Sequence, residues 1–248
     1  VDIGGTFTDV ALEKGEEIFS SKVLTNYTQP EQAIIDGITK AAEAAGISFS
    51  EINTVIHGTT LATNSLIERR GAHTAFITTE GFRDVIEMRT ESRFEQYDLN
   101  ITLPAPLIPR HDRYVIGGRI SASGDELIPI NHDTLHTVIE KIRQEGYESV
   151  AVGLMHSYRN PTHERQVKKT IEERLGNVSV SISSDVSPQI REYERFNTVC
   201  ANAYVKPLMS SYLERLEERL KACGITCPVY LMHSGGGLIS LPTAAEFP

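Results

Sequence analysis

The sequence has few of the features that are typical of secreted proteins, membrane-spanning proteins and proteins stabilised by a structural metal ion. It has 3 cysteines, Cys200, Cys223 and Cys227, and no second pair of Cys or His lies near the last two. A disulfide framework or a structural zinc site is therefore not expected, and we interpret the cysteines as free thiols in core or half-buried positions. No apolar run is long enough to span a bilayer, and the start does not resemble a secretion signal. A cytoplasmic location is expected.

The sequence also has fewer basic residues than acidic ones. The 24 Lys and Arg residues are outnumbered by 33 Asp and Glu residues, which gives a formal net charge of −9. Proteins that bind nucleic acids or membrane surfaces generally need a basic face, so neither kind of partner is expected. The hydrophobic content of 40% and the charged content of 23% are those of an ordinary globular protein. A chain of 248 residues can bury a sizeable core in one or two domains.

The most informative segment is residues 2–9, which reads Asp-Ile-Gly-Gly-Thr-Phe-Thr-Asp. Two adjacent glycines allow a sharp backbone turn with unobstructed N–H groups, so an anion can come close. The hydroxyls of Thr6 and Thr8 can donate to phosphate oxygens, and Asp2 can hold Mg²⁺ directly or through water. The segment therefore predicts a phosphate-binding hairpin for a nucleotide–metal complex.

A simpler interpretation of this segment is an ordinary glycine β-turn flanked by a surface Asp. The additional Thr8-Asp9 and the position at the start of the chain favour the phosphate-binding interpretation. The segment is not a Walker loop, because no lysine follows the glycines.

Hydrophobic periodicity predicts alternating strands and helices. The apolar run over 150–155 is typical of a strand buried between helix layers, and the alternation predicts α/β layers with a mainly parallel sheet. Thr28 and Asn131 are expected to cap helices, and a long helical region after residue 185 is expected to break at Pro207. The expected elements are hairpins over 1–25 and 114–125, helices over 30–45, 60–70 (stopped by Gly71), 131–145, 160–175 and 208–223, and strands over 54–56, 74–78, 150–155 and 229–232.

Residues 81–113 form the least regular stretch and contain several arginines among acids and prolines. A long connection with little periodicity is usually functional or mobile. Arg83, Arg89 and Arg93 are candidates to pair with a substrate carboxylate or a transferring phosphate. For most of them we favour salt bridges across an irregular lid.

Two more segments combine a strand end with glycine or hydroxyl residues. Residues 57–64 lie where a buried strand gives way to a helix, and free N–H groups at such a point attract anions. The alternative is simple capping by threonine, with His57 packed in a loop. Residues 233–237, His-Ser-Gly-Gly-Gly, are equally consistent with a phosphate-wrapping loop and with a glycine turn that holds no ligand.

Taken together, five segments resemble the hydantoinase A / 5-oxoprolinase family. They are residues 2–9, 57–64 (His-Gly-Thr-Thr-Leu-Ala-Thr-Asn), 81–84 (Gly-Phe-Arg-Asp), 160–164 (Asn-Pro-Thr-His-Glu) and 233–237. The resemblance covers essentially the whole chain and keeps the order and spacing of the family. It implies an α/β, actin-like ATPase fold of the ribonuclease-H type, with a mixed sheet and flanking helices, in a fragment of a larger protein whose two lobes close on Mg-ATP.

The activity that the resemblance implies is ATP-dependent opening of a cyclic amide, such as a hydantoin, 5-oxoproline or another lactam. ATP would phosphorylate the carbonyl oxygen, and a hydantoinase B-type subunit would act as partner in an oligomer. The expected cofactors are ATP and Mg²⁺. The resemblance also implies a division into a hydantoinase/oxoprolinase N-terminal region over 1–184 and the start of a second hydantoinase A region over 185–248.

The resemblance also assigns roles to individual residues. Asp2 would organise Mg²⁺, and Asp2, Asp9 and His57 form the expected catalytic set, with Asp9 ordering the hairpin or assisting the metal. His57 would lie beside the transferring phosphate or the substrate ring. The residues expected to bind the nucleotide or to lie near it are Gly4, Gly5, Thr6, Thr8, Thr59, Thr60, Asn64, Gly235 and Gly236.

Two other functions are compatible with the same motifs. One is a subunit of an ATP-dependent ketone carboxylase, which would need bicarbonate. The other is a non-catalytic, actin-like ATPase switch that hydrolyses ATP without a small-molecule substrate. Members of the family carry a second Asp-x-Gly-Gly-Thr loop farther along, so this piece alone is expected to bind nucleotide weakly and to turn over little or nothing. They often show a Gly-Arg-Gln stretch where this chain has residues 88–93, and this departure leaves the substrate open.

Overall fold

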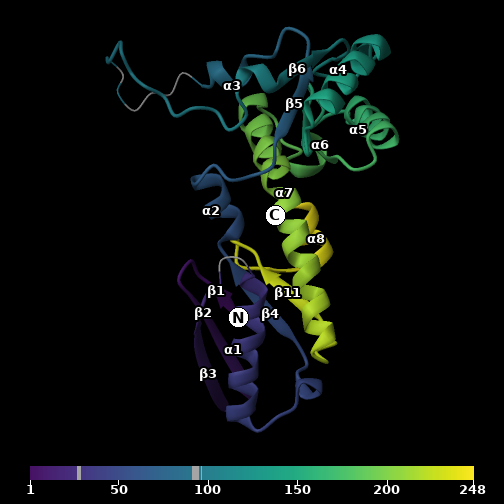
Figure 1. Cartoon of the computed structure of the whole chain (residues 1–248). Coiled ribbons are helices and arrows are strands. Elements are labelled where there is room, and N and C mark those ends of the chain that lie inside the picture. Colours follow the sequence, from purple (N-terminus) through teal and green to yellow (C-terminus); the bar gives the residue numbers. More distant parts are fainter. Residues whose placement is uncertain (27–28, 91–94, 96) are drawn as a thin grey trace. The chain divides into compact units, whose positions relative to one another are not determined.

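The computed structural model describes residues 1–26, 29–90, 95 and 97–248. The chain forms two compact units (Figure 1). The first unit consists of Val1–Glu68 and Leu208–Pro248, and the second unit is Arg69–Pro207. Each unit has its own sheet and its own core. The division after residue 184 concerns sequence regions and stays a prediction.

The first unit is built on a six-stranded mixed sheet. Its strands are β1 (Asp2–Ile3), β2 (Phe7–Lys14), β3 (Glu17–Leu24), β4 (Val55–Thr59), β11 (Val229–Met232) and β12 (Leu238–Ser240). Their order is β12-β11-β4-β1-β2-β3, in which β11, β4 and β1 are parallel neighbours. The remaining pairs are antiparallel. The hairpin predicted over 1–25 is confirmed, with its turn at Gly15 in the left-handed region (φ 65°).

Helices cover one face of this sheet (Figure 1). They are α1 (Pro30–Ala45) and the second part of α7 (Glu192–Ala222), and they form one apolar cluster with Ile3, Val10, Val55 and Leu231 from the strands. As predicted, α1 ends at Gly46 in the left-handed conformation, whereas the cap expected of Thr28 lies outside the described residues. The unit is completed by η1 (Phe49–Glu51), α2 (Leu61–Ile67) and α8 (Leu241–Glu246).

The second unit has a four-stranded sheet in which every pair is parallel, as the alternation of strands and helices predicts. The strands are β5 (Thr74–Thr79), β6 (Arg113–Ile116), β9 (Ser149–Gly153) and β10 (Ser179–Ile182), in the order β10-β9-β5-β6. Apolar residues of α4 (His132–Glu145) and α5 (Thr162–Arg174) form one core cluster with the strands, and the first part of α7 contributes to another. Shorter elements are α3 (Val85–Met88), η2 (Arg110–Asp112), the antiparallel pair β7 (Arg119–Ile120) and β8 (Glu126–Ile128), and α6 (Ser183–Val186).

Two predicted helix starts in this unit are confirmed by their hydrogen bonds. The Asn131 side chain accepts from the N–H of Thr134 at 3.0 Å, and the Asn160 side chain accepts from the N–H of Thr162 at 3.1 Å. Both contacts satisfy an N–H that has no partner inside its own helix.

The predicted break at Pro207 is wrong, because α7 runs through the proline without interruption. Proline in a helix interior costs about 3 kcal/mol, since it removes one hydrogen bond and crowds the preceding turn. Burial on both sides of Pro207 outweighs that cost, at about 1.5–3 kcal/mol for each large apolar side chain. The buried residues nearest the proline include Ala203 and Val205 before it and Met209 and Tyr212 after it.

The role predicted for Gly71 is also wrong. Helix α2 ends at Ile67, so Gly71 does not terminate it. A Cβ atom at Gly71 would lie 2.2 Å from the ring of Tyr204 and 2.6 Å from its carbonyl oxygen. Glycine is needed here because the backbone passes directly against α7, and sequence periodicity carries no sign of such a contact.

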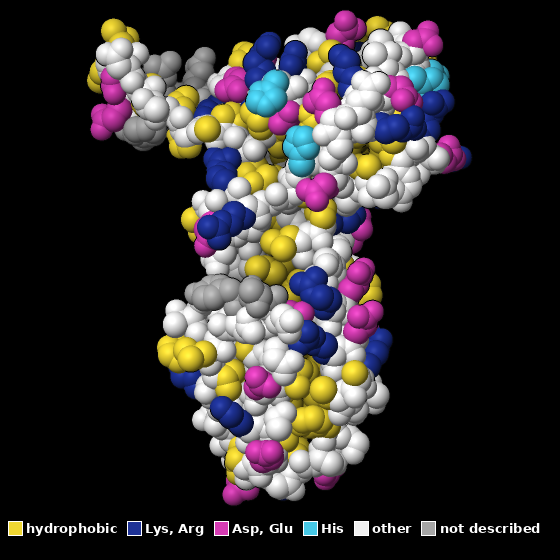
Figure 2. Space-filling view, in the orientation of Figure 1, with side chains coloured by type: hydrophobic (Ala, Val, Ile, Leu, Met, Phe, Trp, Pro, Cys, Tyr) yellow, Lys and Arg dark blue, Asp and Glu magenta, His cyan; other side chains and the backbone are white. Residues whose placement is uncertain are grey.

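Acidic and basic side chains are interspersed over both units on the face shown in Figure 2. Such mixing leaves little long-range field of one sign on that face. Within the described residues, none of the helices has both the length and the apolar character needed to cross a membrane.

Candidate active site

Three loops of the first unit follow three neighbouring parallel strands. Strands β1, β4 and β11 lie side by side, so their carboxyl ends meet at one edge of the sheet. The register pairs Ile3 with Thr59 and Leu231 with His57, and the three loops therefore begin at the same level. This edge is where open α/β sheets bind their ligands. The loops are residues 4–6, 59–64 and 233–237.

The first loop has open backbone donors. The N–H of Gly4 donates to the carbonyl of Phe7 at 2.9 Å, and a Cβ at Gly4 would lie 3.1 Å from that oxygen. A Cβ at Gly5 would meet no atom within 4 Å. In the described part of the chain, the N–H groups of Gly5 and Thr6 and the Thr6 hydroxyl have no hydrogen-bond partner. Gly4 is thus required by the turn, whereas the N–H of Gly5 is open to an anion.

The carboxylate of Asp2 lies on the sheet face opposite the helices. Its neighbour Ile3 is buried in the helix-covered core, and successive side chains of a strand point to opposite faces. A Cβ at Gly58 would lie only 3.1 Å from Oδ1 of Asp2, so the carboxylate rests directly over that glycine. No described residue forms a hydrogen bond or an ion pair with it. The carboxylate is therefore available to a cation.

Asp9 lies beside Asp2 on the neighbouring strand and forms an ion pair with a lysine. The register sets Asp2 opposite Asp9 and Asp9 opposite Lys22, and Nζ of Lys22 lies 2.8 and 3.1 Å from the two carboxylate oxygens of Asp9. Asp2, Asp9, Lys22 and Gly58 line a groove of about 780 Å³ on this face. Lys22 was not among the predicted site residues. It could have been found, because a turn at Gly15 fixes the hairpin register and places it opposite Asp9.

The predicted phosphate ligand Thr8 is fully buried. Its hydroxyl lies 3.1 Å from that of Thr25, whose hydroxyl in turn donates to the carbonyl of Gly4 at 2.9 Å. Thr8 therefore braces the glycine turn from inside. The phosphate contact expected of its hydroxyl stays a prediction.

The second loop is tied together by its own threonines. The N–H of Leu61 donates to the hydroxyl of Thr59 at 3.1 Å, and the amide of Asn64 donates to the hydroxyl of Thr60 at 3.3 Å. Only the first of these bonds satisfies a backbone N–H at the start of α2, as the alternative interpretation expects, and the N-cap residue Thr60 itself makes no side-chain cap bond. Thr59, Thr60 and Asn64 nevertheless lie at the predicted edge of the sheet next to the first loop, with Thr59 and Asn64 half-buried and Thr60 exposed.

The third loop is a tight hairpin turn between β11 and β12. The N–H of His233 donates to the carbonyl of Gly237 at 2.7 Å, and the N–H of Gly236 donates to the carbonyl of His233 at 2.8 Å. The N–H of Gly235 donates to Nδ1 of His233 at 3.0 Å. Gly236 has a φ of 87°, so this turn requires glycine whether or not it holds a ligand.

His57 lies on the other side of the sheet from Asp2. It is 1% exposed, and its Nε2 lies 2.7 Å from the hydroxyl of Tyr212 on α7. Burial lowers the pKa of His57 from 6.5 to about 4, so the ring is neutral at physiological pH. Tyr212 was missed by the sequence analysis, since only the fold brings residues 57 and 212 together.

The arginine-rich stretch belongs to the second unit and makes internal bonds. Arg110 forms a two-pronged ion pair with Asp84 at 2.7 and 2.9 Å, and this bond lowers the pKa of Asp84. Arg83 donates to the carbonyl of Arg110 at 2.7 Å, and Arg89 donates to the carbonyl of Pro104. Arg83 and Arg89 thus bond to backbone carbonyls of the same stretch, and the salt bridges preferred for them are not found among the described residues. Arg93 lies outside the described residues.

Most of the chain matches one protein family. Residues 1–175 match the hydantoinase/oxoprolinase N-terminal region, and residues 195–248 match the hydantoinase/oxoprolinase region. The chain belongs to the hydantoinase/oxoprolinase family. The resemblance carried by the five segments is thereby confirmed.

Relatives of this chain are much longer than the chain itself. A protein of Methanocaldococcus jannaschii without assigned function is 40% identical over 253 residues, which cover 100% of this chain and 37% of the relative. The caprolactamase subunit alpha of Pseudomonas jessenii is 34% identical over 245 residues, or 96% of this chain and 35% of the relative. This chain thus spans about a third of the length of these relatives.

Two solved structures share the fold. The ATP-dependent caprolactamase from Pseudomonas jessenii superposes with a TM-score of 0.86 at 34% identity, over 95% of this chain and 35% of that one. A nucleotide-free acetone carboxylase superposes with a TM-score of 0.88 over 99% of this chain and 37% of that one. At 24% identity the second likeness shows the fold alone. The predicted mixed α/β fold with flanking helices is confirmed.

Proposed function

We propose that this chain is the nucleotide-binding part of an enzyme that uses ATP to hydrolyse a cyclic amide, such as a hydantoin, 5-oxoproline or another lactam. The observation that carries the proposal is the register that brings three loops to one sheet edge, beside an Asp2 carboxylate that has no partner among the described residues. Membership of the hydantoinase/oxoprolinase family supports it, as does 34% identity to a protein named an ATP-dependent caprolactamase.

Mg²⁺ is proposed to bind at Asp2. Magnesium is usually held by one or two carboxylates together with water and substrate phosphates, so a single free carboxylate in an open groove fits it. The N–H groups of Gly5 and Thr6 and the Thr6 hydroxyl are the donors proposed for phosphate oxygens. The residues proposed to border the nucleotide from the neighbouring loops are Thr59, Thr60, Asn64, Gly235 and Gly236.

The proposed chemistry follows from the stability of amides. An amide carbonyl is a poor electrophile, and transfer of the terminal phosphoryl group of ATP to its oxygen would open the ring carbon to attack by water. The residues of this chain would contribute by positioning the phosphates and neutralising their charge. Lys22 beside Asp9 supplies a positive charge in the same groove. His57 is proposed to act through β4, by holding the strand that carries Gly58 and Thr59, since its ring points away from the groove.

Partners and location are further parts of the proposal. A relative named as a subunit supports an assembly with a second, hydantoinase B-type subunit. The three free thiols suit a reducing, cytoplasmic compartment.

The test measures ATP hydrolysis by the full-length protein that contains this chain, with hydantoin, 5-oxoproline, caprolactam or acetone, each with and without bicarbonate. Stimulation by a cyclic amide alone is the expected result. If ATP hydrolysis requires a ketone and bicarbonate, the proposal is wrong and the protein is a ketone carboxylase subunit. If the rate of ATP hydrolysis is the same with every substrate, the proposal is wrong and the protein is an ATPase switch.

A second measurement examines the site itself. Mg-ATP binding is followed by calorimetry for Asp2→Asn and for the matched variant Asp36→Asn, which changes an exposed acid on α1 outside the groove. Asp2→Asn is expected to lose Mg-ATP binding with an unchanged circular dichroism spectrum, and Asp36→Asn to keep it. Normal binding by Asp2→Asn would remove Asp2 from the site.

A further inference from the structure

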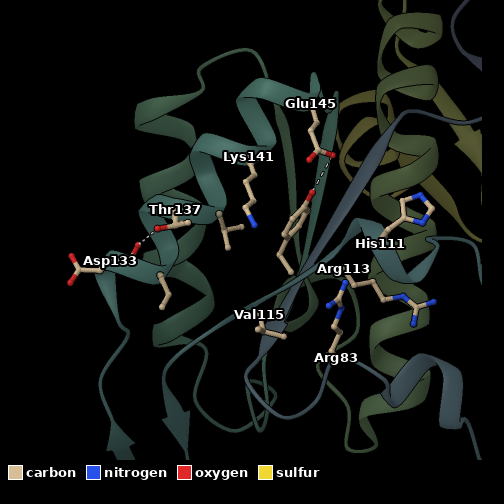
Figure 3. Close-up of a pocket in the computed structure, with 11 residues that line it drawn as sticks. Arg83, His111, Arg113, Val115, Asp133, Thr137, Lys141 and Glu145 are labelled. Atoms are coloured by element: carbon tan, nitrogen blue, oxygen red, sulfur yellow. Dashed lines mark hydrogen bonds between the residues drawn. The ribbon is translucent and has the colours of Figure 1, made fainter.

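A second groove lies in the second unit, at the outer edge of its sheet (Figure 3). It measures about 540 Å³ and runs between β6 and α4. Residues of α4 on one helical face form one wall, and the other wall comes from Arg83 and His111. Figure 3 shows Lys141 pointing from α4 into the space beside β6, with Val115 and Arg83 along the opposite side.

Strand β6 is an edge strand, because it is the last in the order β10-β9-β5-β6. In a parallel pair, one residue directs both its N–H and its carbonyl to the neighbouring strand, and the next residue directs both away. The carbonyl of Ile116 accepts from the N–H of Glu80 at 3.0 Å, so Tyr114 and Ile116 face β5. The N–H and carbonyl of Val115 must therefore point outward, into the groove, and no described residue bonds to them.

The groove also holds positive charge that is not neutralised. Lys141 has no hydrogen-bond or ion-pair partner among the described residues. Arg83 has a buried Nε without a hydrogen-bond partner, although its Nη2 donates to the carbonyl of Arg110 and its charge lies near Asp84. The two acids of the lining are less available. The carboxylate of Glu145 lies within 3.3 Å of the hydroxyls of Tyr114 and Tyr147, and Figure 3 shows Asp133 directed away from the groove.

We propose that this groove binds an extended, acidic segment of a partner protein, which adds as a further strand beside β6. Outward N–H and carbonyl groups recognise an extended backbone and offer little to a small anion. Alternate side chains of the added strand would meet α4 on one side and Arg83 with His111 on the other. An acidic side chain would meet Lys141, whose ammonium group has no partner among the described residues.

A simpler explanation of the same features is that β6 is an edge strand protected against pairing. Short edge strands flanked by charged side chains are a common way to prevent unwanted pairing, and β6 has four residues. A protected edge and a strand-addition site make opposite predictions about the outward N–H of Val115. That difference defines the test.

The test uses the full chain and a fluorescent decapeptide of alternating Thr and Glu, with a Thr and Lys decapeptide for comparison, and measures binding by anisotropy. Val115→Pro removes the outward N–H, a change that edge strands tolerate, and Val115→Thr, which keeps the N–H, is its control. Lys141→Glu reverses the charge in the groove, and Lys169→Glu reverses an exposed charge on α5 outside it. Circular dichroism checks that every variant is folded.

The acidic peptide is expected to bind, the basic one not to bind, and Lys141→Glu to weaken binding by about tenfold. Val115→Pro is expected to abolish binding, while Val115→Thr and Lys169→Glu retain it. The amide of Val115 should exchange its hydrogen more slowly when the peptide is bound. Absence of binding at about 1 mM peptide, or equal binding to Val115→Pro, would overturn the proposal.

Discussion

The hydroxyl of Tyr212 and Nε2 of His57 lie 2.7 Å apart in the core of the first unit, joining α7 to β4. The pair is thus tied to the strand whose end forms the second loop of the candidate site. Burial of a neutral imidazole lowers the free energy of unfolding only when the pH falls, because the imidazole is protonated more easily in the unfolded chain than in the folded one.

The first prediction concerns this pH dependence. The pKa of His57 is about 4 in the folded chain and 6.5 in the unfolded chain. Between these two pH values the unfolded state therefore binds more protons. The stability of the first unit should therefore be complete above about pH 6.5 and fall towards pH 4, by about 3 kcal/mol at most.

The measurement is hydrogen exchange of the β4 and α7 amides at pH 7 and pH 4.5. The double variant His57→Phe/Tyr212→Phe removes both polar partners and should lose less stability between the two pH values than the parent. His132→Gln, which changes an exposed histidine, should behave as the parent does. An unchanged pH profile in the double variant would show that His57 is not the group responsible.

The second prediction concerns Lys22. Asp2 and Asp9 face each other in register, and like charges in that position repel unless a cation lies near them. Lys22→Met should therefore keep or increase the affinity for free Mg²⁺ while lowering the affinity for ATP, whose phosphates lose a positive neighbour. Calorimetry with each ligand separates the two effects, and Lys40→Met, an exposed lysine on α1, is the control. A parallel loss for both ligands would indicate a general structural defect instead.

The third prediction concerns Gly58. A methyl group there would lie 3.1 Å from Oδ1 of Asp2 and push the carboxylate aside by a few tenths of an ångström. Displacements of this size at a binding site are costly, so Gly58→Ala should weaken Mg-ATP binding by about tenfold with little loss of stability. Gly176→Ala, where the new Cβ has only an ordinary contact at 3.9 Å, should change neither quantity. If Gly58→Ala binds as the parent does, the carboxylate of Asp2 is not held in place by that glycine.

Much of the fold could be predicted because its signals are local. Gly46 ends α1 and Asn131 caps α4 as expected, since each depends on residues within one turn of the helix. The three loops of the candidate site were also found from local glycine and threonine patterns. The three loops lie together at the sheet edge because of the strand order and register, and neither can be read from the sequence.

The errors and omissions share a physical cause, which is contact between segments far apart in the sequence. Local pattern predicts a helix stop at Gly71, because the close approach of Tyr204 that requires glycine there depends on tertiary packing. Local pattern predicts a break at Pro207, because the burial that stabilises α7 around the proline comes from tertiary contacts. His57 was expected beside a phosphate, and only the partner Tyr212, 155 residues away, shows which way its ring points.

The last prediction concerns Glu164, which the sequence suggested only as part of a helix start. Its side chain is fully buried and accepts hydrogen bonds from the N–H groups of Leu154 and Ser184, at 2.8 Å each, and from the Ser183 hydroxyl at 2.6 Å. The same hydroxyl accepts from the buried guanidinium of Arg195 at 2.9 Å. Glu164 is thus a buried anion that offsets a buried cation through one shared serine.

Glu164→Gln keeps the shape of the side chain but leaves Arg195 with less compensation in a dry environment. The amide nitrogen of Gln cannot accept a hydrogen bond, so one of the two buried N–H groups, of Leu154 or Ser184, would also lose its acceptor. An unsatisfied buried donor typically costs about 1–3 kcal/mol, so the second unit should unfold at a lower urea concentration. Glu173→Gln, on the exposed side of α5, should shift unfolding by less than about 0.5 kcal/mol. Hydrogen exchange of the β9 amides localises the effect, and β9 protection equal to that of the parent would mean that Arg195 is adequately compensated by Glu192 alone, 3.0 Å from its Nη2.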